Sequence, residues 1–123
     1  MEKDLNYLIN KSNILRKHVI EMVARQGKGY VQQGLGASDL FSVLFFNELK
    51  NINIVSNINR DRFFLSTAHN SALFHATMAE KGLINIDSLE DYCLDGSPLE
   101  INVSERLGSF VEATCGSLGQ GLS

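Results

Sequence analysis

The sequence lacks three features that would each point to a class of partner or a compartment. Lysine and arginine form no cluster and the formal net charge is −3, which argues against nucleic acid or an anionic membrane as the main partner. No apolar run approaches the roughly 20 residues of a membrane span. The first residues are mixed in charge and contain no apolar signal region. We therefore expect a cytoplasmic protein with no nucleic acid or membrane partner.

Side chains that hold metals are scarce or wrongly spaced. Cys93 and Cys115 form no CxxC pair, so neither a zinc site nor a disulfide framework is indicated, and reduced thiols fit a cytoplasmic protein. The remaining acidic cluster belongs to a short helix predicted over 87–93, capped by Asp87 or Ser88. Its spacing is that of a solvated helical face without an EF-hand pattern, so we predict no metal ligand in this chain.

Helical periodicity is the main structural signal that is present. The 123 residues are enough for one domain with a core of its own. Apolar residues recur at helical spacing over 5–25, with Asp4 predicted as the cap and Gly27 as the stop of this helix. Two further helices are predicted over 37–50 and 69–82.

Other segments predict loops and strands. The glycine-rich segment 27–36 reads as a flexible loop without the P-loop spacing, and 51–59 as a polar connection. Short strands are predicted over 61–67, with an apolar core at 63–65, and over 110–114.

The fold class follows from the order of these elements. Helices come before and between the short strands, and the run that contains Gly116, Gly119 and Gly121 predicts a strand end, a tight turn and the start of a helix. This order predicts an α/β fold in which helices pack on a mainly parallel sheet. Ligands of such folds bind at the carboxyl ends of the strands.

Only three histidines are candidates for acid–base chemistry. His18 is predicted to face solvent on the first helix, and His75 to be packed or partly exposed within the third rather than catalytic. His69 differs, because it follows a strand-like run and opens a helix, where it can donate to an anion. By position alone, both a structural and a functional role for His69 stay open.

Several segments together resemble the transketolase family, in the right order. They are "GYVQQGLGASDLFSVLFF", "RDRFFLSTAHNSALFHATMAEKG", "SLEDYCLDGSPL" and "VEATCGSLGQGLS". The last segment is the most specific of the four. The resemblance covers almost the whole chain from Gly29 onward, and it implies a thiamine diphosphate-dependent enzyme.

The resemblance implies that residues 1–123 are the N-terminal portion of the diphosphate-binding domain, incomplete at the C-terminus. His69 would contact the diphosphate and lie near the reacting carbon as a catalytic residue. Gly116, Leu118 and Gly119 would line the turn beside the cofactor. The ligands of Mg²⁺ are expected downstream, so the chain alone is expected to be inactive.

A second set of implications concerns partners. The resemblance implies that a pyrimidine-binding domain, or a C-terminal transketolase-like subunit, completes the site in a homo- or hetero-oligomer. The implied reaction transfers a two-carbon ketol or acyl unit from a ketose to an aldehyde.

The chain departs from the family at two substrate-binding positions. Tyr30 and Asn102 stand where the family has histidines, and Thr67 and Ala68 precede His69 where the family has lysine and glycine. Tyrosine titrates near about 10 and asparagine not at all, so neither is a ready base at neutral pH. We therefore expect a substrate other than the usual sugar phosphates. Two alternatives stay open: another thiamine diphosphate carboligase or decarboxylase subunit, and a non-catalytic remnant or assembly subunit.

Overall fold

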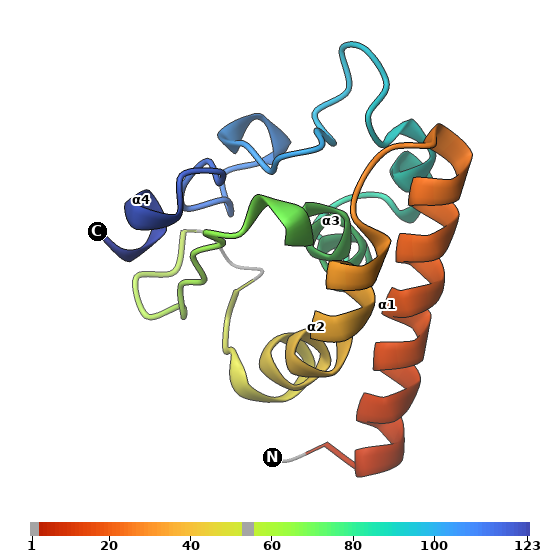
Figure 1. Ribbon diagram of the computed structural model, residues 1–123. Helices are drawn as coiled ribbons and strands as arrows, with labels where there is room; N and C mark the ends of the chain where they lie inside the picture. The colour runs from red at the N-terminus through yellow and green to blue at the C-terminus, as the bar shows by residue number, and fades with distance from the viewer. Residues whose placement is uncertain (1–2, 53–55) are drawn as a thin grey trace.

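Helices dominate the chain, and the computed structural model describes them over residues 3–52 and 56–123 (Figure 1). Three helices, α1, α2 and α3, pack against one another. Residues 84–117 then run over one end of α3, and the short α4 lies on the side away from α1 (Figure 1). In chain order the elements are α1 (Leu5–Gln26), α2 (Val31–Val43), the π-helical turn η1 (Leu44–Glu48), the 3-10 turn η2 (Ala68–Asn70), α3 (Ser71–Glu80), the 3-10 turns η3 (Ile86–Asp91) and η4 (Glu105–Leu107), and α4 (Leu118–Leu122). Residues 53–55 of the predicted polar connection lie outside the described residues.

The first helix has the predicted ends. Asp4 stands at the N-cap position, although its side chain makes no capping hydrogen bond. Gly27 ends α1 in the left-handed conformation, with φ of +65°, and its N–H donates to the Val23 carbonyl at 2.8 Å.

The second helix begins earlier than predicted, which corrects the reading of 27–36 as a loop. Helix α2 starts at Val31, so Gly34 and Gly36 lie inside it. A Cβ on Gly34 would lie 2.9 Å from Val19 Cγ1, so this glycine allows α1 and α2 to approach closely. The glycines predict a flexible loop, whereas Gly34 lies within α2 and serves helix packing.

The third helix was predicted correctly in type and end. Every residue from Ser71 to Ala79 is buried, so α3 is the centre of the core. Gly82 closes it with φ of +81°, and the Leu83 N–H donates to the Met78 carbonyl at 2.9 Å.

The predicted α/β fold is wrong, because the described residues form helices and no strand or sheet. The segments 61–67 and 110–114 are irregular. The aromatic ring of Phe63 packs 4.8 Å from Phe45 and 6.1 Å from Phe74, centroid to centroid, and Phe64 is 52% exposed. The apolar run that suggested a strand is thus accommodated by packing onto helices, without the backbone ladder that a strand needs.

The acidic segment also differs from its prediction. It forms the 3-10 turn η3, whose cap is Asn85 rather than Asp87 or Ser88. The Asn85 Oδ1 accepts a hydrogen bond from the Asp87 N–H at 2.9 Å. No helix in the described part of the chain is both long and apolar enough to cross a membrane.

Candidate functional site

Two of the predicted site residues meet where α2 and α3 begin. Tyr30 is the residue before α2, and His69 lies in η2 just before α3. Their rings are 6.2 Å apart, centroid to centroid, at an interplanar angle of 72°, which is an edge-to-face contact. His69 is half-buried and Tyr30 is 45% exposed, so both side chains remain accessible at this end of the helices.

A second pair of predicted residues lies in the loops that follow. Gly116 has φ of +133°, a conformation that favours glycine. A Cβ placed on Gly116 would meet Asn102 Nδ2 at 4.0 Å and nothing closer, so the asparagine amide is the nearest group to this open backbone. Gly116 and Asn102 are both exposed.

The glycine turn is fastened to the segment before His69 through Ser66. The Gly116 N–H donates to the Ser66 carbonyl at 3.4 Å, and the Ser66 hydroxyl donates to the Leu118 carbonyl at 2.7 Å. A Cβ on Gly121 would overlap Ser66 Cβ and lie 3.0 Å from its Cα, so glycine is required there. At Gly119 such a Cβ would meet nothing within 4 Å. Sequence reasoning did not assign Ser66 or Gly121 to the site, although both lie within the segments that resemble the family.

Buried side chains of α3 link the two pairs. The Ser71 hydroxyl accepts a hydrogen bond from the Val103 N–H at 2.9 Å, next to Asn102. It also lies 3.5 Å from Cys115 Sγ, next to Gly116. The Cys115 N–H donates to the Val103 carbonyl at 3.0 Å. These contacts connect the loops that carry Asn102 and Gly116 to the start of α3, two residues after His69, although the described contacts do not join His69 directly to Asn102.

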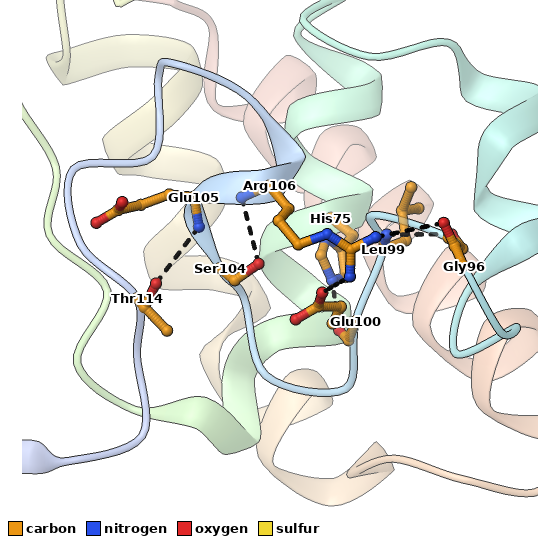
Figure 2. A network of polar contacts seen from close by, with 9 residues as sticks. His75, Gly96, Leu99, Glu100, Ser104, Glu105, Arg106 and Thr114 are labelled. Atoms are coloured by element: carbon orange, nitrogen blue, oxygen red, sulfur yellow. Dashed lines mark hydrogen bonds and ion pairs between the residues drawn. The ribbon is translucent and has the colours of Figure 1, made fainter.

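His75 holds the same loop from the interior. It is fully buried, and its Nε2–H donates to the Glu100 carbonyl at 2.8 Å, while Nδ1 has no partner (Figure 2). Burial lowers the pKa of His75 to about 4, against the opposing effect of its hydrogen bond to Glu100. The side chain is therefore neutral at pH 7, and the prediction of a packed residue rather than a catalytic one fits this placement.

Around Glu100 an outer network fixes the loop further. The Arg106 guanidinium pairs with the Glu100 carboxylate and reaches the Gly96 carbonyl at 3.4 Å (Figure 2). The Arg106 N–H donates to the Ser104 hydroxyl at 3.3 Å, and the Glu105 N–H to the Thr114 hydroxyl at 3.4 Å. These contacts tie the segment that carries Asn102 to the one that precedes Gly116.

The remaining histidine differs from its prediction. His18 does not simply face solvent: its side chain is 17% exposed, and its Nε2 lies 2.9 Å from Glu80 Oε1. Lys11 Nζ lies 3.1 Å from the other oxygen of the same carboxylate. The reason is tertiary, since α3 carries Glu80 to the face of α1 on which His18 lies.

The donor set fits an anionic ligand such as a diphosphate. It consists of an imidazole, a phenol and a primary amide, at His69, Tyr30 and Asn102, beside an open glycine backbone. The buried Asn70 Oδ1 next to His69 has no hydrogen-bond partner and can accept from a hydroxyl or amino group. Within residues 3–52 and 56–123 no three imidazole, thiol or carboxylate side chains gather to hold a metal ion.

A wide hollow in the described structure lies elsewhere. It has a volume of about 550 Å³ and is bounded by η3 and the loop that follows it. None of the predicted site residues lines it.

Comparison with known proteins gives one family. The family model described as "Transketolase, thiamine diphosphate binding domain" matches residues 9–123. A transketolase family protein of Sinorhizobium fredii is 34% identical over 116 residues, which cover 94% of this chain and 42% of the relative. A 6-deoxy-6-sulfo-D-fructose transketolase subunit of a Clostridium species is 30% identical over 121 residues, with coverage of 94% and 42%. The transketolase of Treponema pallidum is 33% identical over 111 residues, with coverage of 89% and 17%. The chain thus spans less than half the length of these relatives.

Proposed function

This chain belongs to the transketolase family, and from that premise we propose that it forms part of a thiamine diphosphate-dependent transferase. The reaction moves a two-carbon ketol unit from a ketose to an aldehyde. The enzyme is cytoplasmic, and a second domain or subunit that binds the pyrimidine ring completes the site in an oligomer. The relative from Clostridium is itself described as a subunit, which supports this arrangement.

The observation that carries the proposal is the convergence of the motif segments. Tyr30 and His69 are neighbours in space although 39 positions separate them (69 − 30), and the Gly116 turn is bonded to Ser66. A remnant that had lost its site would have no need of this juxtaposition. A ligand shared by all these segments explains it.

Each residue has a distinct role in the proposal. Bound thiamine diphosphate supplies the electron sink for two-carbon transfer. His69 donates a hydrogen bond to a diphosphate oxygen and acts as the catalytic residue nearest the reacting carbon. The open backbone at Gly116 and Gly119 allows close approach, and Leu118, which is 59% exposed, offers an apolar contact. The ligands of the accompanying Mg²⁺ come from outside the described residues.

The substrate is a ketose that differs from the usual sugar phosphates. Tyr30 and Asn102 occupy the two positions where the family has histidines, and both side chains are exposed beside the site. They hydrogen-bond substrate hydroxyls without titrating near neutral pH. The name of the Clostridium relative, which refers to a sulfonated ketose, supports a substrate with a modified terminal group.

Cofactor binding tests the function most simply. Isothermal titration calorimetry of the full-length assembly with thiamine diphosphate should give saturable binding that Mg²⁺ strengthens by about tenfold or more, because the ion neutralises the diphosphate. Equal affinity with and without Mg²⁺ would contradict the metal-assisted site. No binding under either condition would favour the non-catalytic assembly subunit.

A double variant tests the substrate assignment. Tyr30→His with Asn102→His should raise kcat/KM for a ketopentose phosphate donor by about tenfold or more, since each histidine restores a titrating group. The control is Tyr30→Phe with Asn102→Ala, which also alters both positions but adds no base. No gain from the histidines over this control would assign the substrate preference to other residues.

A further inference from the structure

The segment that carries Asn102 is held to α3 by two side chains on one helical face. Ser71 and His75 are four residues apart, so they project from the same side of α3. Both are essentially unexposed, at 1% and 0%. Their hydrogen bonds flank Asn102: His75 reaches the Glu100 carbonyl, and Ser71 receives the Val103 N–H.

We propose that Ser71 and His75 are positioning residues that set the location of Asn102, and with it the substrate-binding side of the site, relative to His69. This inference rests on the proposed function. Helix α3 begins at Ser71, two residues after His69, so the same helix follows the proposed cofactor-binding histidine and holds the loop that carries Asn102. A displacement of the loop therefore changes the distance between Asn102 and His69.

The chemistry of His75 supports a positioning role over simple packing. An aliphatic side chain would fill the same core position without leaving a ring nitrogen, Nδ1, unpartnered in the interior. What the imidazole adds is one hydrogen bond to a backbone carbonyl two residues before Asn102. Its ring also lies edge-on to Tyr92, with centroids 5.8 Å apart.

Tyr92 extends the same support toward Tyr30. A Cβ on Gly29 would lie 2.5 Å from the Tyr92 hydroxyl, so the backbone next to Tyr30 rests directly on this buried ring. The chain of contacts runs from the Glu100 carbonyl through His75 and Tyr92 to Gly29. Both positions at which this chain departs from the family are therefore supported by the same buried side chains.

Three variants test the proposal in the full-length assembly. His75→Leu fills the volume but removes the donor, while His75→Gln keeps an N–H near the position of Nε2. Ser71→Ala removes the second bond with a smaller change in volume and serves where His75→Leu fails to fold. Thr77→Val is the matched control, because Thr77 is buried on α3 and its hydroxyl bonds to the Leu73 carbonyl of the same helix.

The first readout needs no activity. In hydrogen–deuterium exchange, His75→Leu and Ser71→Ala should speed exchange of residues 101–103 by about tenfold or more, because each removes a buried hydrogen bond. His75→Gln should restore protection, and Thr77→Val should leave these residues unchanged. Two results would overturn the positioning role. One is unchanged exchange in both His75→Leu and Ser71→Ala, and the other is equal exchange in His75→Leu and His75→Gln.

The second readout separates positioning from general damage. The KM for the ketose donor that the wild-type assembly turns over should rise about fivefold or more in His75→Leu, with thiamine diphosphate affinity held within about twofold, and His75→Gln should recover it. A parallel loss of both affinities would overturn the assignment to the substrate side. If the wild-type assembly turns over no ketose, the proposed function fails, while the exchange readout still decides whether these side chains hold the loop.

Discussion

The two ends of α3 use polar side chains in different ways. At its carboxyl end, the Glu80 carboxylate lies 3.1 Å from Lys11 Nζ and 2.9 Å from His18 Nε2, so an ion pair with Lys11 and a contact with His18 join α3 to α1. At its amino end, Ser71 is hydrogen-bonded to the Val103 N–H, and His69 lies edge-to-face with the Tyr30 ring with no carboxylate among its described contacts. The Lys11–Glu80 ion pair at one end stabilises the packing of α1 on α3. At the other end, the proposed site leaves the His69 side chain available to an anionic ligand.

The pKa values follow the same contrast. Burial alone would raise the pKa of Glu80, but hydrogen bonds from His18 and Lys11 outweigh it and hold the pKa below its ordinary value. Burial of His75 instead lowers its pKa to about 4, because desolvation outweighs the hydrogen bond to the Glu100 carbonyl and the nearby Glu100 charge, which both act to raise it. The surroundings of Glu80 thus favour its charged form, whereas the interior position of His75 favours its neutral form.

The largest expected effect concerns His69. His69→Ala should lower turnover by about 10²–10⁴-fold, because it removes the proposed proton-transferring group and a diphosphate donor. The control is His18→Ala. His18 lies on α1 beside the carboxyl end of α3, and like His69 it is partly buried. Because its role is in helix packing, turnover of this variant should stay within a few-fold of wild type. Steady-state kinetics on the full-length assembly measure both. Equal losses in the two variants would remove the functional distinction between the ends.

Acid should lower the free energy of unfolding because of the buried His75. The unfolded chain binds the proton with a pKa of about 6.5, against about 4 when folded, so the unfolded state binds more protons between these values. The contribution of His75 should therefore lower the free energy of unfolding as the pH falls from about 6.5 to about 4, by on the order of 3 kcal/mol, and then level off. Urea denaturation at several pH values measures this. His75→Gln should lose that part of the pH dependence, and an identical slope in the variant would assign it to other groups.

The smallest expected effect lies at the carboxyl end. Glu80→Gln should lower the free energy of unfolding at pH 7 by on the order of 1 kcal/mol, because His18 and Lys11 lose their partner in a half-buried setting. Since the pKa of Glu80 is depressed, this contribution should disappear in acid as the carboxylate is protonated. Glu21→Gln is the control, because Glu21 pairs with Lys17 at 4.0 Å on an exposed face and should matter little. A loss for Glu80→Gln no larger than for Glu21→Gln would show that the cluster does not stabilise the helix pair.

Local patterns in the sequence predicted the helices better than the sheet. Helical periodicity located α1 and α3, and the glycines Gly27 and Gly82 located their ends, because both signals are properties of the segment itself. A strand, by contrast, exists only with a partner. The apolar run around Phe63 satisfied the pattern, but its side chain packs among the phenylalanines of the helices instead.

The residues of the candidate site divide in the same way, into those that a local motif identifies and those that only the folded structure identifies. His69, Tyr30, Asn102 and the glycine turn were singled out by motif, and the motif positions carry that information in sequence. The contacts of Ser71 with Val103 and of His75 with Glu100 join residues 32 and 25 positions apart, and no local pattern encodes them. Residues that support a site through tertiary contacts become visible only in the folded chain.

One measurement tests the central claim, that these segments form one cofactor site, most directly. Hydrogen–deuterium exchange of the full-length assembly should be recorded with and without thiamine diphosphate and Mg²⁺. The account predicts new protection in residues 66–70 and 115–119, on both sides of the contact between Ser66 and the glycine turn. Protection confined to the hollow of about 550 Å³ beside η3, with no change around His69, would contradict it.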